Sequence, residues 1–195
     1  MKNHAPLELP QQALYVFSGG PGSGKTTLLS ELGRRGYQTV AEVARVIIRE
    51  QMALRGIALP WKDKKKYKML MLERSVESYK EIAATAKGPV FFDRGIPDTI
   101  AYSRLCGLEI TPTEKEVVVA CPYHHPVFMF PPWAEIYRKD QERKQDWVEA
   151  VETYGLLWQT YLDYGYKVLE VPKVSVPERT RWLLDQLGLP ENVQI

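Results

Sequence analysis

Short runs of apolar residues alternate along the chain with longer segments in which apolar and polar residues recur at helical spacing. The apolar runs have the length and continuity of buried strands, and they cover residues 13–18, 37–42, 90–94, 124–130 and 166–172. The helix-like segments cover residues 25–35, 43–56, 63–86, 97–107, 111–121, 147–161 and 176–188. Because strands and helices alternate, the pattern predicts an α/β fold with a parallel sheet and helices on both of its faces.

Glycine and proline residues mark the ends of several predicted helices. Gly36 and Gly56 follow the first two, while Pro97 begins the fourth and Gly107 ends it. No internal repeat, low-complexity tract or linker interrupts the alternation. We therefore expect a single domain over residues 1–195, with its core at about 13–188.

Aromatic residues add two expectations. One face of the segment 147–161 is apolar at three- and four-residue steps, and we expect it to pack in the core; its residues are Trp147, Val151, Tyr154, Trp158 and Tyr161. Trp61 and Trp133 follow prolines at loop positions. Each of these two side chains either stacks on a flat substrate or packs in the core, and the sequence leaves both interpretations open.

The composition is that of a globular protein. Of the 195 residues, 45% are apolar and 26% are charged, and the formal net charge of +2 is too small to indicate nucleic-acid or membrane binding by itself. Cys106 and Cys121 lack a paired spacing, which is typical of reduced thiols in the cytosol. No run approaches the roughly 20 apolar residues of a membrane span. The first residues also lack the apolar stretch of a signal peptide, so we expect a cytoplasmic protein.

A phosphate-binding loop is the most specific motif in the sequence. Residues 19–26 match the pattern Gly, four residues of any type, Gly-Lys and Ser or Thr, between a predicted strand and a predicted helix. Glycines let backbone N–H groups point inward toward a phosphate, and the helix N-terminus adds its dipole. Lys25 can reach the terminal phosphates, and the Thr26 hydroxyl can bind Mg²⁺. The predicted nucleotide-binding residues are Gly20, Gly22, Ser23, Gly24, Lys25, Thr26 and Thr27.

Charged residues at the ends of two other predicted strands belong near this loop, because ligands of parallel sheets bind at the carboxyl ends of the strands. Asp93 and Arg94 end the run 90–94: Asp93 is placed to hold Mg²⁺ or to take a hydroxyl proton, and Arg94 to lie across a transferring phosphoryl group. Glu42 ends the run 37–42 and is either a general base or substrate ligand, or only an ion-pair partner of Arg45.

A charged segment after the fourth predicted strand has the position of a lid. We expect this lid at about residues 131–147, with Arg138 and Arg143 closing over bound phosphates to exclude water and stabilise negative charge. The alternative is a solvated helix, since Arg138 with Glu142 and Asp140 with Arg143 have ordinary helical spacings.

Several stretches together resemble the small AAA-type ATPase/kinase domains related to the ribosylnicotinamide kinase part of NadR. They read SGGPGSGKTT, AEVAR, VFFDRGIPDTIAYSRLCG, PPWAEIYRKDQERKQ and GYKVLEVPKVSVPERTRWLL, and the resemblance extends over about residues 14–187. It implies a nucleoside/nucleotide-kinase-like P-loop fold, a three-layer sandwich with about five parallel strands in the order 2-3-1-4-5.

The same resemblance bears on the charged residues. Asp93 and Arg94 are similar to the acid–arginine pair after the third strand of deoxynucleoside and thymidylate kinases, and Glu42 resembles the acid after their second strand. Hydrolytic AAA motors usually carry Asp-Glu where this chain has Asp93-Arg94. This departure favours phosphoryl transfer to a bound acceptor.

The leading hypothesis is therefore a kinase that uses ATP and Mg²⁺ and phosphorylates a small nucleoside-like metabolite. Its expected catalytic residues are Lys25, Glu42, Asp93, Arg94, Arg138 and Arg143, with Thr26 and Asp93 at the magnesium ion and either Glu42 or Asp93 as the base. One alternative is an ATP-dependent switch or ATPase that acts through a protein partner. Another is a 5′-hydroxyl polynucleotide kinase, against which the mild net charge argues.

Overall fold

The computed structural model describes residues 13–136 and 147–192. The strands are β1 (Leu14–Gly19), β2 (Gln38–Val40), β3 (Val90–Asp93), β4 (Val127–Phe130) and β5 (Val168–Glu170). The helices are α1 (Lys25–Arg34), α2 (Val43–Ala53), α3 (Lys64–Thr85), α4 (Ile96–Leu105), α5 (Pro112–Ala120), α6 (Trp147–Asp163) and α7 (Val176–Leu187).

The strands form one parallel sheet in the order β2-β3-β1-β4-β5, which confirms the predicted fold and strand order. β1 is the central strand, and Phe17 is in register with Asp93 of β3. On its other side, Gly19 is in register with Phe130 of β4. All strands run in the same direction, so the loops that follow β1, β3 and β4 leave the sheet at the same edge.

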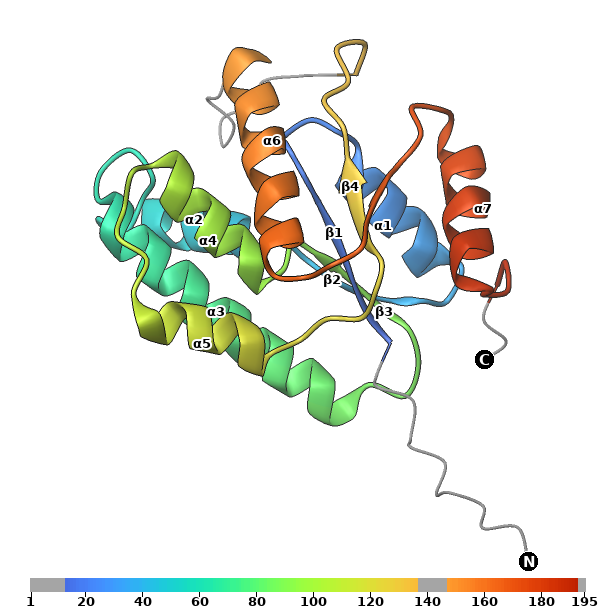
Figure 1. The fold of residues 1–195 in the computed structure, drawn as a ribbon, viewed down its shortest axis with the longest axis horizontal. Helices are drawn as coiled ribbons and strands as arrows, with labels where there is room; N and C mark the ends of the chain where they lie inside the picture. Colours follow the sequence, from blue (N-terminus) through green and yellow to red (C-terminus); the bar gives the residue numbers. More distant parts are fainter. Residues whose placement is uncertain (1–12, 137–146, 193–195) are drawn as a thin grey trace, which may run out of the picture.

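Helices cover both faces of the sheet (Figure 1). Successive side chains of a strand point to opposite faces. Leu14 and Val16 therefore pack in the core beneath α3, α4, α5 and α6, whereas Tyr15 and Phe17 pack in the core beneath α1 and α7. The two hydrophobic cores fix the sheet between two helical layers.

A smaller apolar cluster lies between α2 and α3. Ile47 and Ile48 of α2 pack there against Leu59, Tyr67 and Met71. This cluster holds α2 in place, and with it Glu42, which precedes the helix. None of the described helices is both long and apolar enough to cross a membrane.

The structure corrects three sequence-based expectations. β2 ends at Val40, so Glu42 is the N-cap residue of α2 and not a strand end. β4 begins at Val127, and residues 124–126 before it are not part of the sheet. Trp147 and Val151 are 39% and 46% exposed, because the buried face of α6 runs through Ala150, Leu157 and Tyr161, and Trp147 and Val151 lie beside this face.

Candidate active site

The phosphate-binding loop joins β1 to α1, and its backbone has the shape that its glycines predict. Gly24 is the N-cap residue of α1 and has a φ of 87°, in the left-handed region that glycine adopts without steric cost. Lys25 is only 6% exposed, and its Nζ donates hydrogen bonds to the carbonyl oxygens of Gly19 (3.0 Å) and Gly20 (2.9 Å). The Ser23 hydroxyl donates to the same Gly20 oxygen at 2.8 Å. The lysine is thus held against its own loop, beside the N-terminus of α1.

The burial of Lys25 changes its acidity. Burial and the positive charge of Arg94 lower the pKa of Lys25 to about 8, although nearby carboxylates act in the opposite direction. An anion that approaches the ammonium group therefore stabilises its charged form, because water no longer solvates this charge.

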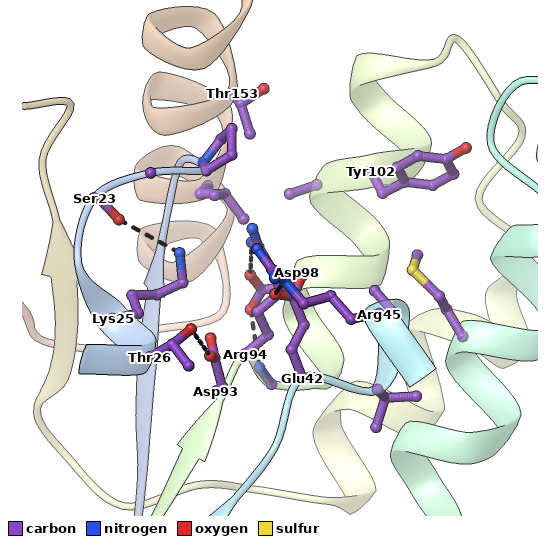
Figure 2. Close-up of a pocket in the computed structure, with 18 of the residues that line it drawn as sticks. Ser23, Lys25, Thr26, Glu42, Arg45, Asp93, Arg94, Asp98, Tyr102 and Thr153 are labelled. Atoms are coloured by element: carbon purple, nitrogen blue, oxygen red, sulfur yellow. Dashed lines mark hydrogen bonds and ion pairs between the residues drawn. The ribbon is translucent and has the colours of Figure 1, made fainter. Parts of the chain in front are cut away.

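Asp93 and Thr26 form the second part of the site (Figure 2). The Thr26 hydroxyl donates to Oδ2 of Asp93 at 3.1 Å. Asp93 is 4% exposed, and its Oδ1 has no hydrogen-bond partner among the described residues. Burial raises the pKa of Asp93, which reflects the cost of a charged carboxylate in this environment. An unsatisfied carboxylate oxygen beside a threonine hydroxyl at a phosphate-binding loop fits the oxygen ligands that Mg²⁺ prefers.

Next to Asp93 and Thr26, Glu42 forms ion pairs with two arginines. Nε of Arg94 donates to Oε1 of Glu42 at 2.7 Å, and Nε of Arg45 donates to Oε2 at 3.1 Å. Burial by itself raises the pKa of Glu42, but the charges of Arg94, Lys25 and Arg45 outweigh it and lower the pKa to about 2. Glu42 is therefore ionised at neutral pH, and each of its oxygens keeps a lone pair for a further hydrogen bond.

Asp98 fixes the position of Arg94. Its Oδ1 accepts hydrogen bonds from Nη1 of Arg94 (2.9 Å) and from the Ser18 hydroxyl (2.8 Å). Its Oδ2 accepts from the backbone N–H of Gly95 (3.0 Å) and from the Tyr161 hydroxyl (2.6 Å). Arg94 itself has a φ of 73°, an uncommon conformation for a non-glycine residue. These contacts connect the end of β1, the start of α4 and the last turn of α6 through one carboxylate.

One pocket of about 770 Å³ is lined by Ser23, Lys25, Thr26, Glu42, Arg45, Asp93, Arg94 and Asp98. At one end of it are the residues Gly22 to Thr27 of the phosphate-binding loop. The opposite end has an apolar and aromatic wall from α2, α3, α4 and the turn before α3, formed by Ile48, Trp61, Tyr67, Met71, Tyr102 and Leu105. Figure 2 shows Glu42 and Arg94 between the phosphate-binding loop and this wall. The pocket therefore has a polar end at the phosphate-binding loop and a second, more apolar end on the far side of Glu42 and Arg94.

The structure brings together four of the predicted catalytic residues, namely Lys25, Glu42, Asp93 and Arg94. Arg138 and Arg143 lie outside the described residues, as does most of the predicted lid. Trp61 lines the pocket at 40% exposure.

Sequence reasoning assigned no role to Asp98 or Arg179, both of which line the pocket. The four-residue step from Arg94 to Asp98 at the start of a helix is a signal for the first. Nothing local in the sequence distinguishes Arg179 from the exposed Arg181.

Comparison with known proteins agrees with this geometry. A family model described as an AAA domain matches residues 14–179. The sequence has no significant match among curated proteins.

Solved structures share the fold at low sequence identity. NadR in complex with NAD and AMP-PNP has a TM-score of 0.70 at 15% identity, over 95% of this chain and 51% of the NadR chain. NadR in complex with NR has a TM-score of 0.73 at 17% identity, over 92% of this chain and 53% of that one. Deoxyadenosine kinase from M. mycoides has a TM-score of 0.64 at 14% identity, over 90% of this chain and 98% of the kinase.

The chain thus spans about half the length of the NadR chains, and at these identities the likeness is one of fold. The family model covers most of the chain and includes the phosphate-binding loop, Glu42, Asp93 and Arg94. The protein therefore belongs to the AAA domain family, and its fold is similar to that of NadR.

Proposed function

We propose that the protein is a kinase that transfers the γ-phosphoryl group of ATP, with Mg²⁺, to a hydroxyl group of a small nucleoside-like molecule. The observation that carries this proposal is the two-ended pocket, in which Glu42 and Arg94 lie between the phosphate-binding loop and a separate aromatic wall. A hydrolase needs room for water beside its nucleotide, whereas a kinase needs a second substrate site in line with the phosphate chain.

The polar end of the pocket binds ATP in this proposal. The backbone N–H groups of residues 22–27 hold the phosphates, and Lys25 leaves the carbonyl oxygens of its own loop for the β- and γ-phosphates. Thr26 and Asp93 would hold the magnesium ion, which would supply positive charge to the phosphate oxygens. The fold neighbour NadR was solved with AMP-PNP, which supports an adenine nucleotide as the ligand.

The apolar end holds the acceptor. Glu42 keeps a lone pair on each oxygen and orients the acceptor hydroxyl toward the γ-phosphorus. As transfer proceeds, the bond from the γ-phosphorus to ADP breaks, a bond to the acceptor oxygen forms, and the hydroxyl proton moves to a carboxylate. With a pKa of about 2, Glu42 is a weak base, which suffices because positioning dominates in loose phosphoryl-transfer transition states.

Arg94 and the aromatic wall complete the acceptor site. The guanidinium of Arg94 is fixed by Glu42 and Asp98 beside the path of transfer, where it stabilises charge on the phosphoryl oxygens. Tyr67 and Tyr102 contact each other edge to face at 5.4 Å between ring centroids. A flat ring on the acceptor, such as a base or a pyridine, is suited to packing against these side chains.

The experiment is ADP release from Mg-ATP in the presence of nucleosides, nicotinamide riboside, deoxynucleotides, sugars and a short 5′-hydroxyl oligonucleotide. We expect release that depends on one class of small acceptor, and a reduction of about 10²- to 10⁴-fold in Glu42→Gln. Glu50→Gln is the matched control, because Glu50 lies on the same helix and pairs with Arg74 outside the pocket.

Other results separate the alternatives. Tight ATP binding without any acceptor effect would contradict the kinase and favour a nucleotide-dependent switch. Release that depends on the oligonucleotide alone would favour a polynucleotide kinase.

A further inference from the structure

Arg179, on the first turns of α7, is a buried cation for which the described part of the chain supplies no counter-charge. It is 4% exposed, and its Nε has no hydrogen-bond partner among the described residues. No ion pair joins it to a carboxylate within residues 13–136 and 147–192. Burial lowers the pKa of Arg179, and no acid in the described part of the chain offsets the effect. A buried charge without a partner is costly, so its persistence calls for a ligand that compensates it.

The guanidinium lies against the phosphate-binding loop. A β-carbon placed on Gly24 would lie 2.7 Å from Nη1 of Arg179 and 3.3 Å from Cδ1 of Ile136. Gly24 therefore lacks a side chain for two reasons, its φ of 87° and the close approach of this arginine. Arg179 also lines the same pocket as Lys25 and Thr27.

An aromatic ring supports the guanidinium from another side. Its Cζ lies 5.2 Å from the centroid of Trp133, which follows β4. Such a cation–π contact orients the planar group but supplies no negative charge. Trp133 thus holds the arginine in place and leaves its hydrogen-bonding edge for an anion.

We propose that Arg179 is a nucleotide-binding residue whose guanidinium binds the phosphate chain of the nucleotide at the outer side of Gly24, on the α-phosphate side. Lys25 binds the β- and γ-phosphates inside the loop, and Arg179 binds the α-phosphate outside it. The fork of N–H donors on an arginine matches two phosphate oxygens. This assignment rests on the proposed nucleotide site and extends it to a helix near the end of the chain.

The assignment predicts that removing Arg179 weakens phosphate binding without lowering the stability of the ligand-free protein. If the charge of Arg179 is uncompensated until a phosphate arrives, Arg179→Met removes a desolvation cost from the ligand-free protein and removes a contact from the complex. We expect the ligand-free melting temperature to stay level or rise. We expect the Kd values for ATP, ADP and tripolyphosphate to rise about 10- to 100-fold, with adenosine binding unchanged.

The test measures these four affinities by calorimetry, with melting temperatures beside them, in wild type, Arg179→Met and Arg179→Lys. Lysine keeps the charge and loses the fork, so its Kd values should lie between the other two. Arg181→Met is the matched control, because Arg181 lies on the same helix with its side chain 64% exposed.

Three results would overturn the assignment. Unchanged ATP affinity in Arg179→Met would show that Arg179 does not contact the nucleotide. Weaker binding of adenosine and ATP with unchanged tripolyphosphate binding would move the contact to the base. A lower ligand-free melting temperature in both variants, with wild-type affinity for tripolyphosphate in Arg179→Lys, would make the role structural. Failure of the wild type itself to bind ATP is a different result, which overturns the nucleotide site and this assignment together.

Discussion

The protonation of Lys25 affects both the folding stability and the proposed nucleotide binding. Its pKa of about 8 lies below the ordinary value of 10.5, so between these values an unfolded chain binds more protons than the folded one. The contribution of Lys25 to folding stability therefore rises with pH across this window. Binding follows the opposite trend, because the phosphate site needs the charged lysine.

We predict that the affinity for ATP falls as the pH rises above about 8. Once Lys25 is neutral in the free protein, binding must take up a proton, and Kd then increases about tenfold per pH unit. Calorimetry between pH 7 and 9.5 measures this slope. Arginine stays charged throughout the range, so Lys25→Arg should bind with a flat profile. An equal slope in both proteins would assign the titration to another group.

Asp93 carries a prediction for the metal. Asp93→Asn keeps the size of the side chain and the acceptor for Thr26, but it removes the charge from the oxygen that has no partner among the described residues. We expect the increase in ATP affinity that Mg²⁺ produces to shrink by at least about tenfold, since an amide is a weaker ligand for this ion. Titrations with and without Mg²⁺ measure it.

The control for Asp93→Asn is Asp185→Asn, on the exposed face of α7. It should leave the magnesium effect intact. A magnesium effect of wild-type size in Asp93→Asn would place the ion elsewhere.

Single residues also show where sequence reasoning ends. The loop residues and Asp93 follow directly from a local pattern of strand, motif and helix, and the structure brings them into one pocket. Arg94 was expected to lie across the phosphoryl group, but its ion pairs with Glu42 and Asp98 depend on residues 52 positions before it and 4 after it. The ion pair of Glu42 with Arg94 could not be predicted from the sequence, because only folding brings the start of α2 next to the end of β3.

At the level of elements, the continuous apolar runs were the reliable signals. β1, β3 and β4 are buried along their whole length, so their sequences contain almost no polar residue and their existence was predictable. β2 is a short edge strand with exposed positions, and its pattern did not show where it ends. The apolar face of α6 was read as core over its full length, but its first turn buries the small Ala150, and Trp147 and Val151 beside it stay partly exposed.

Asp98 joins three elements, and its removal should cost much stability. In Asp98→Ala, Ser18 and Tyr161 lose their acceptor and Arg94 loses one of its two carboxylates. Breaking a buried charged network of this kind costs about 3–5 kcal/mol in the free energy of unfolding. Urea denaturation measures it.

The comparison for this loss is Glu50→Ala. Glu50 and Arg74 also form an ion pair, at 2.8 Å, but their side chains are 41% and 38% exposed. Its removal should cost less than about 1 kcal/mol. Similar losses in the two variants would mean that Asp98 does not organise the site.

For the whole molecule, nucleotide binding should appear as added thermal stability. At a concentration of Mg-ATP about 100 times Kd, binding to the folded state alone contributes about 2.7 kcal/mol. For a chain of this size the melting temperature should rise by roughly 5–10 °C. Differential scanning fluorimetry measures the shift. Lys25→Ala should melt close to the wild type without nucleotide and show little shift with it, and an equal shift in the variant would exclude the loop as the binding site.

The position of β1 in the sheet has a consequence for how the protein is made. Of the five described strands, β1 is the first to leave the ribosome, yet it pairs with residues 90–93 on one side and with 128–130 on the other. Until those segments emerge, the strand that carries the phosphate-binding loop has no neighbours, and its apolar side chains have nothing to pack against. Tyr161, which completes the hydrogen bonds of Asp98, is synthesised later still. Nascent chains halted before β4 should therefore remain sensitive to protease and bind no ATP, whereas those that extend past α7 should acquire both properties together.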